Sequence, residues 1–529
     1  MKTIYNKNIL IAVAAFGIVA FSSCIHDLDV TPIDPKVVVA DKVYVDADAY
    51  RSVLAKCYAG YAVSGQEGPA GNADISGLDE GFGQYLRGYF YHQEFTTDEA
   101  IIGWNDGTLY DFHNMAWSAS DGFIGAFYSR VFYQISLCNE FIRESSDDKV
   151  KERGINDAAT IKMYNNEVRF LRALSYYHAI ECFGNVPFVT EENKVGGDLP
   201  QQISRADLFN YVESELLAIA PQMAAPRANE YGRADRAAAW MLLARLYLNA
   251  EVFTGTSRWS DCRKYCEDII NAGYTLEPKY DYLFLADNDL CKDTETIFAI
   301  NFDSENTTTY GGMDFIIFAE VGGKMDAASM GITSGWGGYR TTPQFVDKFD
   351  IEKDSRAMFF ISGQTKDVKE LGEFKYGYAF EKFKNVKRDG KTQSGISEAY
   401  VSTDFPMFRL ADAYLMYAEC AVRGSGDKTI ALGYVNLLRQ RAYGNISGNI
   451  AAYDLTLDFI LDERGRELYL ECVRRTDLIR FNKFTTDSYI WAWKGGSIDG
   501  TSVDSFRNLF PIPSSDITAN PNLKQNAGY

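Results

Sequence analysis

Apolar residues recur every three to four positions in several long segments of the chain, which is the period of an amphipathic α-helix. In 167–181 one stripe is apolar and aromatic, while Arg169 and Arg172 face elsewhere. The segment 233–250 is apolar nearly all round and rich in alanine, so we expect a helix buried between neighbours. The stripe of the first segment contains Phe170, Leu171, Leu174, Tyr177 and His178.

A helical hairpin is predicted further along the chain. Apolar residues keep the helical period over 410–421, Gly424 and Gly426 interrupt it, and a second stripe starts at Leu432. Paired alanine-rich helices with aromatic contacts are similar to tetratricopeptide units, although the repeat of about 34 residues is not regular here. The sequence therefore predicts a mostly α fold, built as a degenerate tetratricopeptide-like scaffold of helical hairpins.

Two stretches of another character lie beside this scaffold. The scaffold is expected at about 127–274 and 406–482, whereas 63–126 and about 275–405 are rich in Gly, Asp, Asn, Thr and aromatic residues and lack a sustained period. We interpret them as a loop-rich lobe with short strands that carries the binding site, because binding residues often lie on loops held by a rigid scaffold. Two short apolar pieces of the second stretch are predicted as strands, 296–301 and 315–318.

The chain begins with the pattern of a secretory signal peptide. Lys2 and Lys7 precede an apolar run over 9–20, and small residues lead into Cys24. A cysteine at this point is where a bacterial lipoprotein receives its acyl chains. We therefore predict a signal peptide at 1–23, a lipidated Cys24 with a tether at 24–40, and a single domain at 41–529 outside the membrane. The alternative is an ordinary signal peptide cleaved nearby, with Cys24 a passenger.

Composition narrows the class of ligand. The formal net charge is −19 with only 4 His, so nucleic acid or another anionic polymer would be repelled, and a neutral ligand fits better. The cysteines after Cys24 mostly lie in helix-like apolar patterns, and no disulfide framework is expected. Cys262 and Cys266 have the spacing of a metal pair but no further ligands nearby, so packing is the preferred interpretation.

Five ordered blocks of the sequence carry a resemblance to a known family. The blocks are EVRFLRALSYYHAIECFGNVPFV (167–189), GRADRAAAWMLLARLYLNA (232–250), DFPMFRLADAYLMYAECAVR (404–423), LDERGRELYLECVRRTDLIRF (461–481) and LFPIPSSDITANPNLKQNAGY (509–529). They are similar to the SusD-like (RagB/SusD) family. The resemblance covers nearly the whole chain after the predicted signal peptide, and with the lipoprotein start it is highly specific. It implies a surface lipoprotein that captures oligosaccharides above a TonB-dependent, SusC-like outer-membrane barrel, without catalysis and without a cofactor.

Within that family the chain most resembles the founding starch-binding member. This resemblance implies a starch-type α-glucan as ligand, or another neutral glycan such as dextran. Ile102 stands where that member has another cradle tryptophan, and the cradle asparagine falls near Asn105 and Asp106, which puts the glucan choice in doubt. The shared segments are TDEA (97–100), TTYGG (308–312), SGWGG (334–338) and FTTDSYIWAWKGGSIDGTSV (484–503), and the matched cradle positions are Arg87, Trp104, Tyr310 and Trp336.

These residue types suit a neutral sugar. A pyranose has an apolar C–H face and an edge of hydroxyls, so its sites pair flat aromatic rings with a few hydrogen-bonding groups. Trp104, Tyr310 and Trp336 could supply the rings, although each ring could instead be core. Arg87 could hold vicinal hydroxyls with its planar donors, or form an ion pair with Asp79 or Glu80. Asn105 and Asp106 could bind hydroxyls or simply form a turn.

Other chemistry-bearing segments favour structural roles. Trp491 and Trp493 are assigned to structure, and Glu471 is expected to pair with Arg474 and Arg475 at helical spacing. Asp287, Asp289 and Asp293 offer oxygen ligands for calcium but lack the spacing of a standard calcium loop, so a solvated acidic loop is preferred.

Two other function classes were weighed against glycan binding. A helical glycoside hydrolase needs two carboxylates that face one bond, and Asp98 with Glu99 is the only candidate pair that the sequence suggests. Adjacent residues rarely flank the same substrate atom, which argues against hydrolysis. A purely protein-binding repeat scaffold would need no aromatic cradle.

Overall fold

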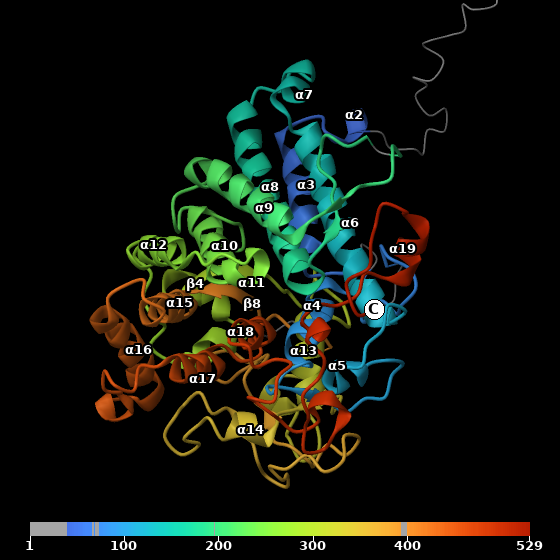
Figure 1. Ribbon diagram of the computed structural model, residues 1–529. Coiled ribbons are helices and arrows are strands. Elements are labelled where there is room, and N and C mark those ends of the chain that lie inside the picture. The colour runs from blue at the N-terminus through green and yellow to red at the C-terminus, as the bar shows by residue number, and fades with distance from the viewer. Residues whose placement is uncertain (1–39, 66–67, 69–72, 195, 393–398) are drawn as a thin grey trace, which may run out of the picture.

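The protein is described from a computed structural model, which covers residues 40–65, 68, 73–194, 196–392 and 399–529. The fold is mostly helical, as the sequence predicts (Figure 1). The predicted signal peptide, Cys24 and the predicted tether up to residue 39 lie outside the described residues. The principal helices are α3 (Ala47–Ala59), α4 (Tyr85–Glu94), α6 (Gly122–Glu144), α8 (Ala158–Cys182), α9 (Arg205–Ile219), α10 (Arg236–Leu248), α12 (Trp259–Ile270), α13 (Gly312–Glu320), α15 (Leu410–Val422), α16 (Lys428–Tyr443), α17 (Leu457–Leu468) and α18 (Arg474–Arg480).

Most of these helices pack in succession along the chain. Helix α6 packs on α8, α8 on α9, α10 on α12, α12 on α15, and α15 on its hairpin partner α16. Aspartate side chains start three of them by accepting hydrogen bonds from the free N–H groups of the first turn, which stabilises a helix end. These are Asp121 at α6, Asp235 at α10 and Asp427 at α16. The predicted scaffold of helical hairpins is confirmed. The shorter helices are α2 (Ala40–Val43), α5 (Asp111–Asn114), α7 (Asp147–Glu152), α11 (Ala250–Thr254), α14 (Pro343–Val346) and α19 (Ser514–Ala519).

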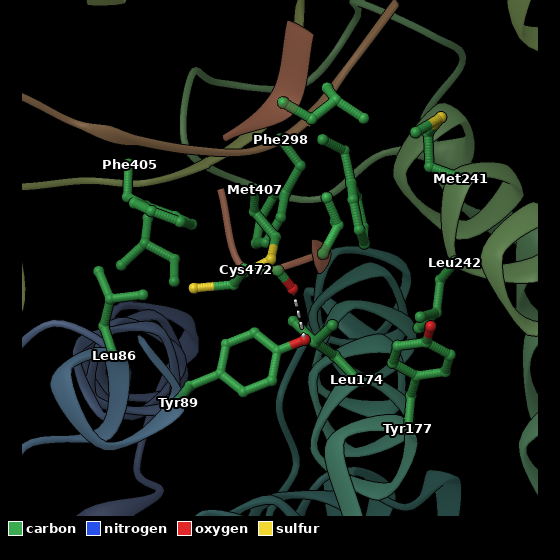
Figure 2. Packing of buried hydrophobic residues seen from close by; sticks show 14 of the residues in the cluster. Leu86, Tyr89, Leu174, Tyr177, Met241, Leu242, Phe298, Phe405, Met407 and Cys472 are labelled. Carbon is green, nitrogen blue, oxygen red and sulfur yellow. Dashed lines mark hydrogen bonds between the residues drawn. The ribbon is translucent and has the colours of Figure 1, made fainter. Parts of the chain in front are cut away.

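The core lies where α4, α8 and α10 meet the strands β4 (Thr296–Ile300) and β8 (Phe405–Arg409). Figure 2 shows Leu86 and Tyr89 of α4 facing Leu174 of α8, with Phe298 and Met407 above them. The predicted buried helix over 233–250 is α10, in which every residue from Met241 to Leu248 is buried. It ends at Asn249, and a separate short helix follows.

Strands are short and come in antiparallel pairs. Among the described residues only β4 and β8 reach five residues, and they pair with each other, so the strand predicted over 296–301 is confirmed. The strand predicted over 315–318 is wrong, because this segment lies within α13. A short apolar run reads equally well as a buried strand or a buried helix. The two-residue strands are β1 (Ile101–Ile102) with β5 (Tyr339–Arg340), β2 (Val186–Pro187) with β3 (Gln202–Ile203), and β6 (Phe359–Phe360) with β7 (Ala379–Phe380).

A buried ion network joins the C-terminal helices to β4 and β8. The guanidinium of Arg409 donates to Glu471 at 2.7 Å, to Glu467 at 2.7 Å and to Glu295 at 2.8 Å. Burial alone would raise the pKa of Glu467, but Arg441 and Arg409 outweigh burial and hold this pKa at about 2. Removing one partner from such a network leaves an uncompensated buried charge, which typically costs about 3–5 kcal/mol.

The expected pairing of Glu471 with Arg474 and Arg475 is wrong. Leu470 and Cys472 have φ of 59° and 61°, so the chain leaves the helix before α18 begins at Arg474, and helical spacing does not apply. Glu471 instead accepts from Lys382 at 2.8 Å, besides Arg409.

Membrane-spanning character, the cysteines and two tryptophans were also considered in the sequence, and the structure describes each of them. Among the described residues, no helix combines the length and the apolar character needed to cross a membrane. The eight cysteines from Cys57 to Cys472 are buried and free within the described part of the chain. Trp491 is buried and the indole of Trp493 donates to the carbonyl of Val368 at 2.8 Å, in keeping with structural roles.

Candidate functional site

The site is built around α13, which connects the two halves of the predicted cradle. Gln84, the residue that caps α4, uses its side-chain oxygen to accept from the N–H of Arg87 at 2.7 Å and from the N–H of Gly312 at 2.8 Å. Its amide donates to the carbonyl of Tyr61 at 2.6 Å. One buried glutamine therefore fixes the start of α13 against the start of α4, and with it the loop that carries Tyr310.

Arg87 lies beneath this loop and is only 4% exposed. Its guanidinium sits between the rings of Phe82 and Phe315, at 4.1 and 4.3 Å from their centroids, and donates to the carbonyl of Tyr310 at 2.7 Å. It also donates to the hydroxyl of Tyr91. Among the described residues it forms no ion pair with Asp79 or Glu80, so that alternative is wrong. Arg87 acts on the site by holding Tyr310 in place.

Tyr310 presents its ring to solvent, with 43% of the residue exposed. The buried carboxylate of Glu80 fixes the backbone beside it, accepting from the hydroxyl of Thr309 at 2.8 Å and from the N–H of Tyr310 at 3.3 Å. Burial raises the pKa of Glu80, more than these hydrogen bonds lower it. Tyr400 places a second ring 6.0 Å from that of Tyr310. This end of the site is therefore a pair of tyrosines on a fixed loop.

The two tryptophans, 232 residues apart in sequence, are brought together by strand pairing. Ile101 pairs with Arg340 and Ile102 with Tyr339. The N–H of Gly103 extends this register by donating to the carbonyl of Gly338 at 2.7 Å. Trp104 follows Gly103 directly, and Trp336 lies two residues before Gly338. The two rings lie 6.3 Å apart with an interplanar angle of 42°. The indole N–H of Trp104 donates to the carbonyl of Trp336 at 3.3 Å. Both rings are partly exposed.

The glycines around Trp336 permit close approach of backbones. A Cβ on Gly335 would lie 2.1 Å from the carbonyl oxygen of Val321, and one on Gly338 would lie 2.9 Å from the Trp104 ring. The N–H of Trp336 donates to the carbonyl of Phe318, near the end of α13, at 2.7 Å. Only glycine can occupy these positions without displacing the neighbouring chain.

Helix α13 thus has the tyrosine pair at its first turn and the tryptophan pair at its last. Nine residues of α-helix extend about 13 Å, so the two ends of α13, beside which the aromatic pairs lie, are about that far apart. The ring of Phe315 lies between them, 5.9 Å from the ring of Trp104 and against Arg87. The structure therefore brings four of the predicted residues together along α13: Trp104, Tyr310 and Trp336 as rings, and Arg87 as their support.

Asn105 and Asp106 follow Trp104 directly and both are exposed. The carbonyl of Asp106 accepts from the N–H of Leu109 at 3.0 Å, and Gly107 has φ of 53°, so these residues form a turn. Within the described part of the chain neither side chain has a hydrogen-bond partner, so their polar atoms are open to a ligand. Both residues remain candidates for contacts to ligand hydroxyls.

The described residues give no support to calcium at Asp287, Asp289 and Asp293, the alternative to a solvated acidic loop. No group of three or more His, Cys, Asp or Glu able to hold a metal ion is found among the described residues. Asp289 and Asp293 belong to the 3₁₀-helix η3 (Asn288–Asp293), which Asp287 precedes. At about 2 Å of rise per residue, Asp287 and Asp293 are about 12 Å apart along this helix, too far to share an ion. Asp287 instead accepts from the N–H of Arg388 at 3.1 Å.

Asp98 and Glu99 are structural carboxylates. Asp98 accepts two hydrogen bonds of 2.7 Å from the guanidinium of Arg474 and one of 2.7 Å from the hydroxyl of Tyr489. Burial would raise the pKa of Asp98, but Arg474 outweighs burial and lowers it. Glu99 accepts from the N–H of Leu470 at 2.9 Å. Both are fully buried, so neither can face a bond in a substrate.

Three residues of the site were not predicted from the sequence. Gln84 and Glu80 make the hydrogen bonds that fix the Tyr310 loop, and Tyr400 adds a ring. Each lies far from its partner in sequence, and no spacing rule links them. The only available signal was for Gln84, a polar residue at the start of an apolar helical run, where caps are found.

Comparison with known proteins decides the family. Residues 351–529 match the profile of the SusD family. Along its whole length the chain is 35% identical to the Starch-binding protein SusD of Bacteroides thetaiotaomicron, and the alignment covers 100% of both proteins. The chain belongs to the SusD family. A SusD-like protein of Bacteroides ovatus is 23% identical, over 73% of this chain and 71% of its own.

Solved structures of SusD-like proteins share the fold. The surface glycan-binding protein A of Bacteroides fluxus aligns with 92% of this chain and all of its own, with a TM-score of 0.69 and 23% identity. The corresponding protein of Bacteroides thetaiotaomicron in complex with laminarihexaose aligns with 91% of this chain and 99% of its own, with a TM-score of 0.70 and 20% identity. Membership of the SusD family makes the chain a binding protein and not an enzyme.

Proposed function

We propose that this SusD-family protein captures starch-type α-glucan oligosaccharides at the cell surface and passes them to a TonB-dependent, SusC-like outer-membrane barrel. The observation that carries the proposal is the tilted pair Trp104 and Trp336, joined through α13 to Tyr310 and Tyr400. Flat rings beside both ends of a helix about 13 Å long suit a chain of sugar rings. The full-length relative named for starch binding supports the choice of glucan.

The chemistry of the surface favours a neutral ligand. Arg87 is buried beneath the Tyr310 loop and already donates to Tyr310 and Tyr91, so it offers little charge to an anion. The net charge of −19 repels polyanions. Asn105 and Asp106 leave polar side-chain atoms open beside Trp104 to meet hydroxyls. Hydrogen bonds to hydroxyls and contacts to C–H faces are the two interactions that a neutral glycan needs.

The proposed location rests on the sequence. The apolar run before Cys24 and the cysteine itself are typical of a lipoprotein, and acyl chains at Cys24 would anchor the domain to the outer membrane. Residues 24–40 would act as the tether and 41–529 as the single binding domain. A surface anchor keeps the captured glycan next to its transporter.

A panel of neutral glycans tests the proposed ligand. Calorimetric titrations with maltoheptaose, amylopectin, dextran, laminarihexaose, levan and xylan would be run on the wild type and on Trp104→Ala. We expect the α-1,4-glucans to bind most tightly and Trp104→Ala to lose that binding. Preference for dextran or laminarihexaose would replace the ligand but keep the site. Equal binding of all ligands by both proteins would reject the site.

A further inference from the structure

A second hollow lies outside the aromatic cradle, between α3, the loop 229–233 and β4. It has a volume of about 320 Å³, within the range of small-molecule sites. Two further hollows of about 330 and 360 Å³ share Tyr231 with it. None of the three is lined by Trp104, Tyr310 or Trp336. Tyr231 therefore lines three neighbouring hollows that lie outside the cradle.

The aromatic lining of the 320 Å³ hollow is rigid. The hydroxyl of Tyr58 donates to Glu167 at 2.7 Å and accepts from the N–H of Ala234 at 2.9 Å. The hydroxyl of Tyr231 donates to Asp404 at 2.7 Å. Because both hydroxyls are already bonded to protein groups, the rings are held in one orientation and offer apolar surface to the hollow. Preorganised rings reduce the entropy cost of binding.

The charges at the hollow are compensated within the protein. Arg51 pairs with Glu230 at 2.8 Å, and Arg233 pairs with Glu167 through contacts of 2.5 and 3.0 Å. An ionic ligand would have to break one of these pairs, whereas a neutral one can hydrogen-bond to the donors and acceptors that remain. Arg51 and Glu230 are each more than half exposed, so their free atoms are accessible at the rim.

One amide is left open at this rim. Asn301 follows β4 directly, is exposed, and has no side-chain hydrogen bond within the described part of the chain. The loop approaches it so closely that a Cβ on Gly232, which has φ of 81°, would lie 2.5 Å from its side-chain oxygen. A free amide beside fixed aromatic rings is the polar half of a sugar site.

We infer that this hollow is a second binding site for a neutral hexose unit, held by the rings of Tyr58 and Tyr231 and by the amide of Asn301. Thr307, which lines the hollow, is three residues before Tyr310, so at most about 11 Å of chain separates it from the cradle loop. The inference rests on the proposed function for its sugar class, and it adds a subsite for a chain end or a branch of the same glycan.

The test reads the two sites separately by hydrogen–deuterium exchange, with maltotriose and maltoheptaose as probes. Peptides that cover 334–338 report on the cradle, and peptides that cover 229–233 report on the hollow. We expect both sets to be protected in the wild type. Ala55→Trp, which places a large ring in the hollow, should abolish protection at 229–233 and leave 334–338 protected. Ser52→Trp adds the same ring to α3 outside the hollow and serves as the control.

Failure of this inference differs from failure of the proposed function. Protection at 334–338 without protection at 229–233, at saturating probe, overturns the second site. No protection at 334–338 with either probe refutes the cradle instead. If Ala55→Trp does not fold, Asn301→Ala, at an exposed position, tests the second site in its place. In this variant about fivefold more probe should be needed to reach the same protection at 229–233. An unchanged dependence of that protection on probe concentration would exclude the assigned role of the amide.

Discussion

Replacement of Trp336 by alanine is the sharpest test of the cradle. The ring is partly exposed and packs with the ring of Phe318 at 5.0 Å on one side and with Trp104 on another. Covering about 50 Å² of open ring with ligand contributes about 1.3 kcal/mol at about 25 cal/mol per Å². Stacking adds about 1 kcal/mol. Together these give about 2 kcal/mol, so Trp336→Ala should raise the Kd for maltoheptaose roughly 30-fold.

The same substitution has a structural cost that must be separated from binding. An exposed ring would leave stability unchanged, but the contact with Phe318 shows that part of this ring is packed. Loss of a half-buried tryptophan should cost about 1–2 kcal/mol of unfolding free energy, below the range for a fully buried one. Trp240→Ala removes a tryptophan of similar burial from α10 and is the matched control.

Calorimetry and thermal melting on the same samples decide the outcome. Trp336→Ala should lose affinity and melt slightly earlier, while Trp240→Ala should melt earlier with an unchanged Kd. A folded Trp336→Ala protein with wild-type affinity for every glucan would refute the reasoning, because the central ring of the proposed platform would then contact no ligand.

Three further predictions concern other parts of the molecule. Cys24→Ala should move the folded protein from the membrane fraction to the soluble fraction, and retention of this variant in membranes that lack the barrel would contradict lipidation. Asp98→Asn should lower the unfolding free energy by about 3–5 kcal/mol, measured by chemical denaturation, because Arg474 is left buried without its counterion. Wild-type protein incubated with maltoheptaose should release no new reducing ends. Burial raises the pKa of Glu94 to about 7, so its contribution to stability is complete below about pH 4.5 and is lost as the pH rises through 7; Glu94→Gln should reduce the fall of unfolding free energy between about pH 4.5 and 7, and an equally steep fall in this variant would refute the assignment.

The helical scaffold could be predicted because its signal is local. An apolar stripe with a period of 3.6 residues predicted α8 and the α15–α16 hairpin, and nearly continuous apolar sequence predicted the buried α10. The prediction failed at 315–318, where four consecutive apolar residues fit a strand as well as they fit the buried helix α13. It also failed at Glu471, because two residues of positive φ break the helix that its spacing assumed.

The site could be predicted only in part, for a different reason. The aromatic residues were found through resemblance and through their glycine-rich surroundings, yet the glycines serve mainly to let the chain approach Val321 and Trp104. The groups that fix the Tyr310 loop make contacts more than 200 residues apart, such as Glu80 with Thr309. No periodicity or motif records a contact of that range, so Gln84, Glu80 and Tyr400 emerged only from the fold.

The arrangement of these contacts explains how a loop-rich surface can present rings in fixed positions. Tyr310 and Trp336 both lie outside regular secondary structure, but both are held at their backbones. The N–H of Trp336 donates to the carbonyl of Phe318 in α13. Tyr310 precedes α13 by two residues, and its backbone is bonded to Arg87 and Glu80. Gln84 and Arg87 in turn bind that helix and its loop to α4, which is part of the core. Disturbing Gln84 should therefore change both aromatic pairs together, whereas a change at Trp336 acts on one end. A ligand that spans both pairs needs their spacing to be constant, and a buried helix between them supplies that constancy.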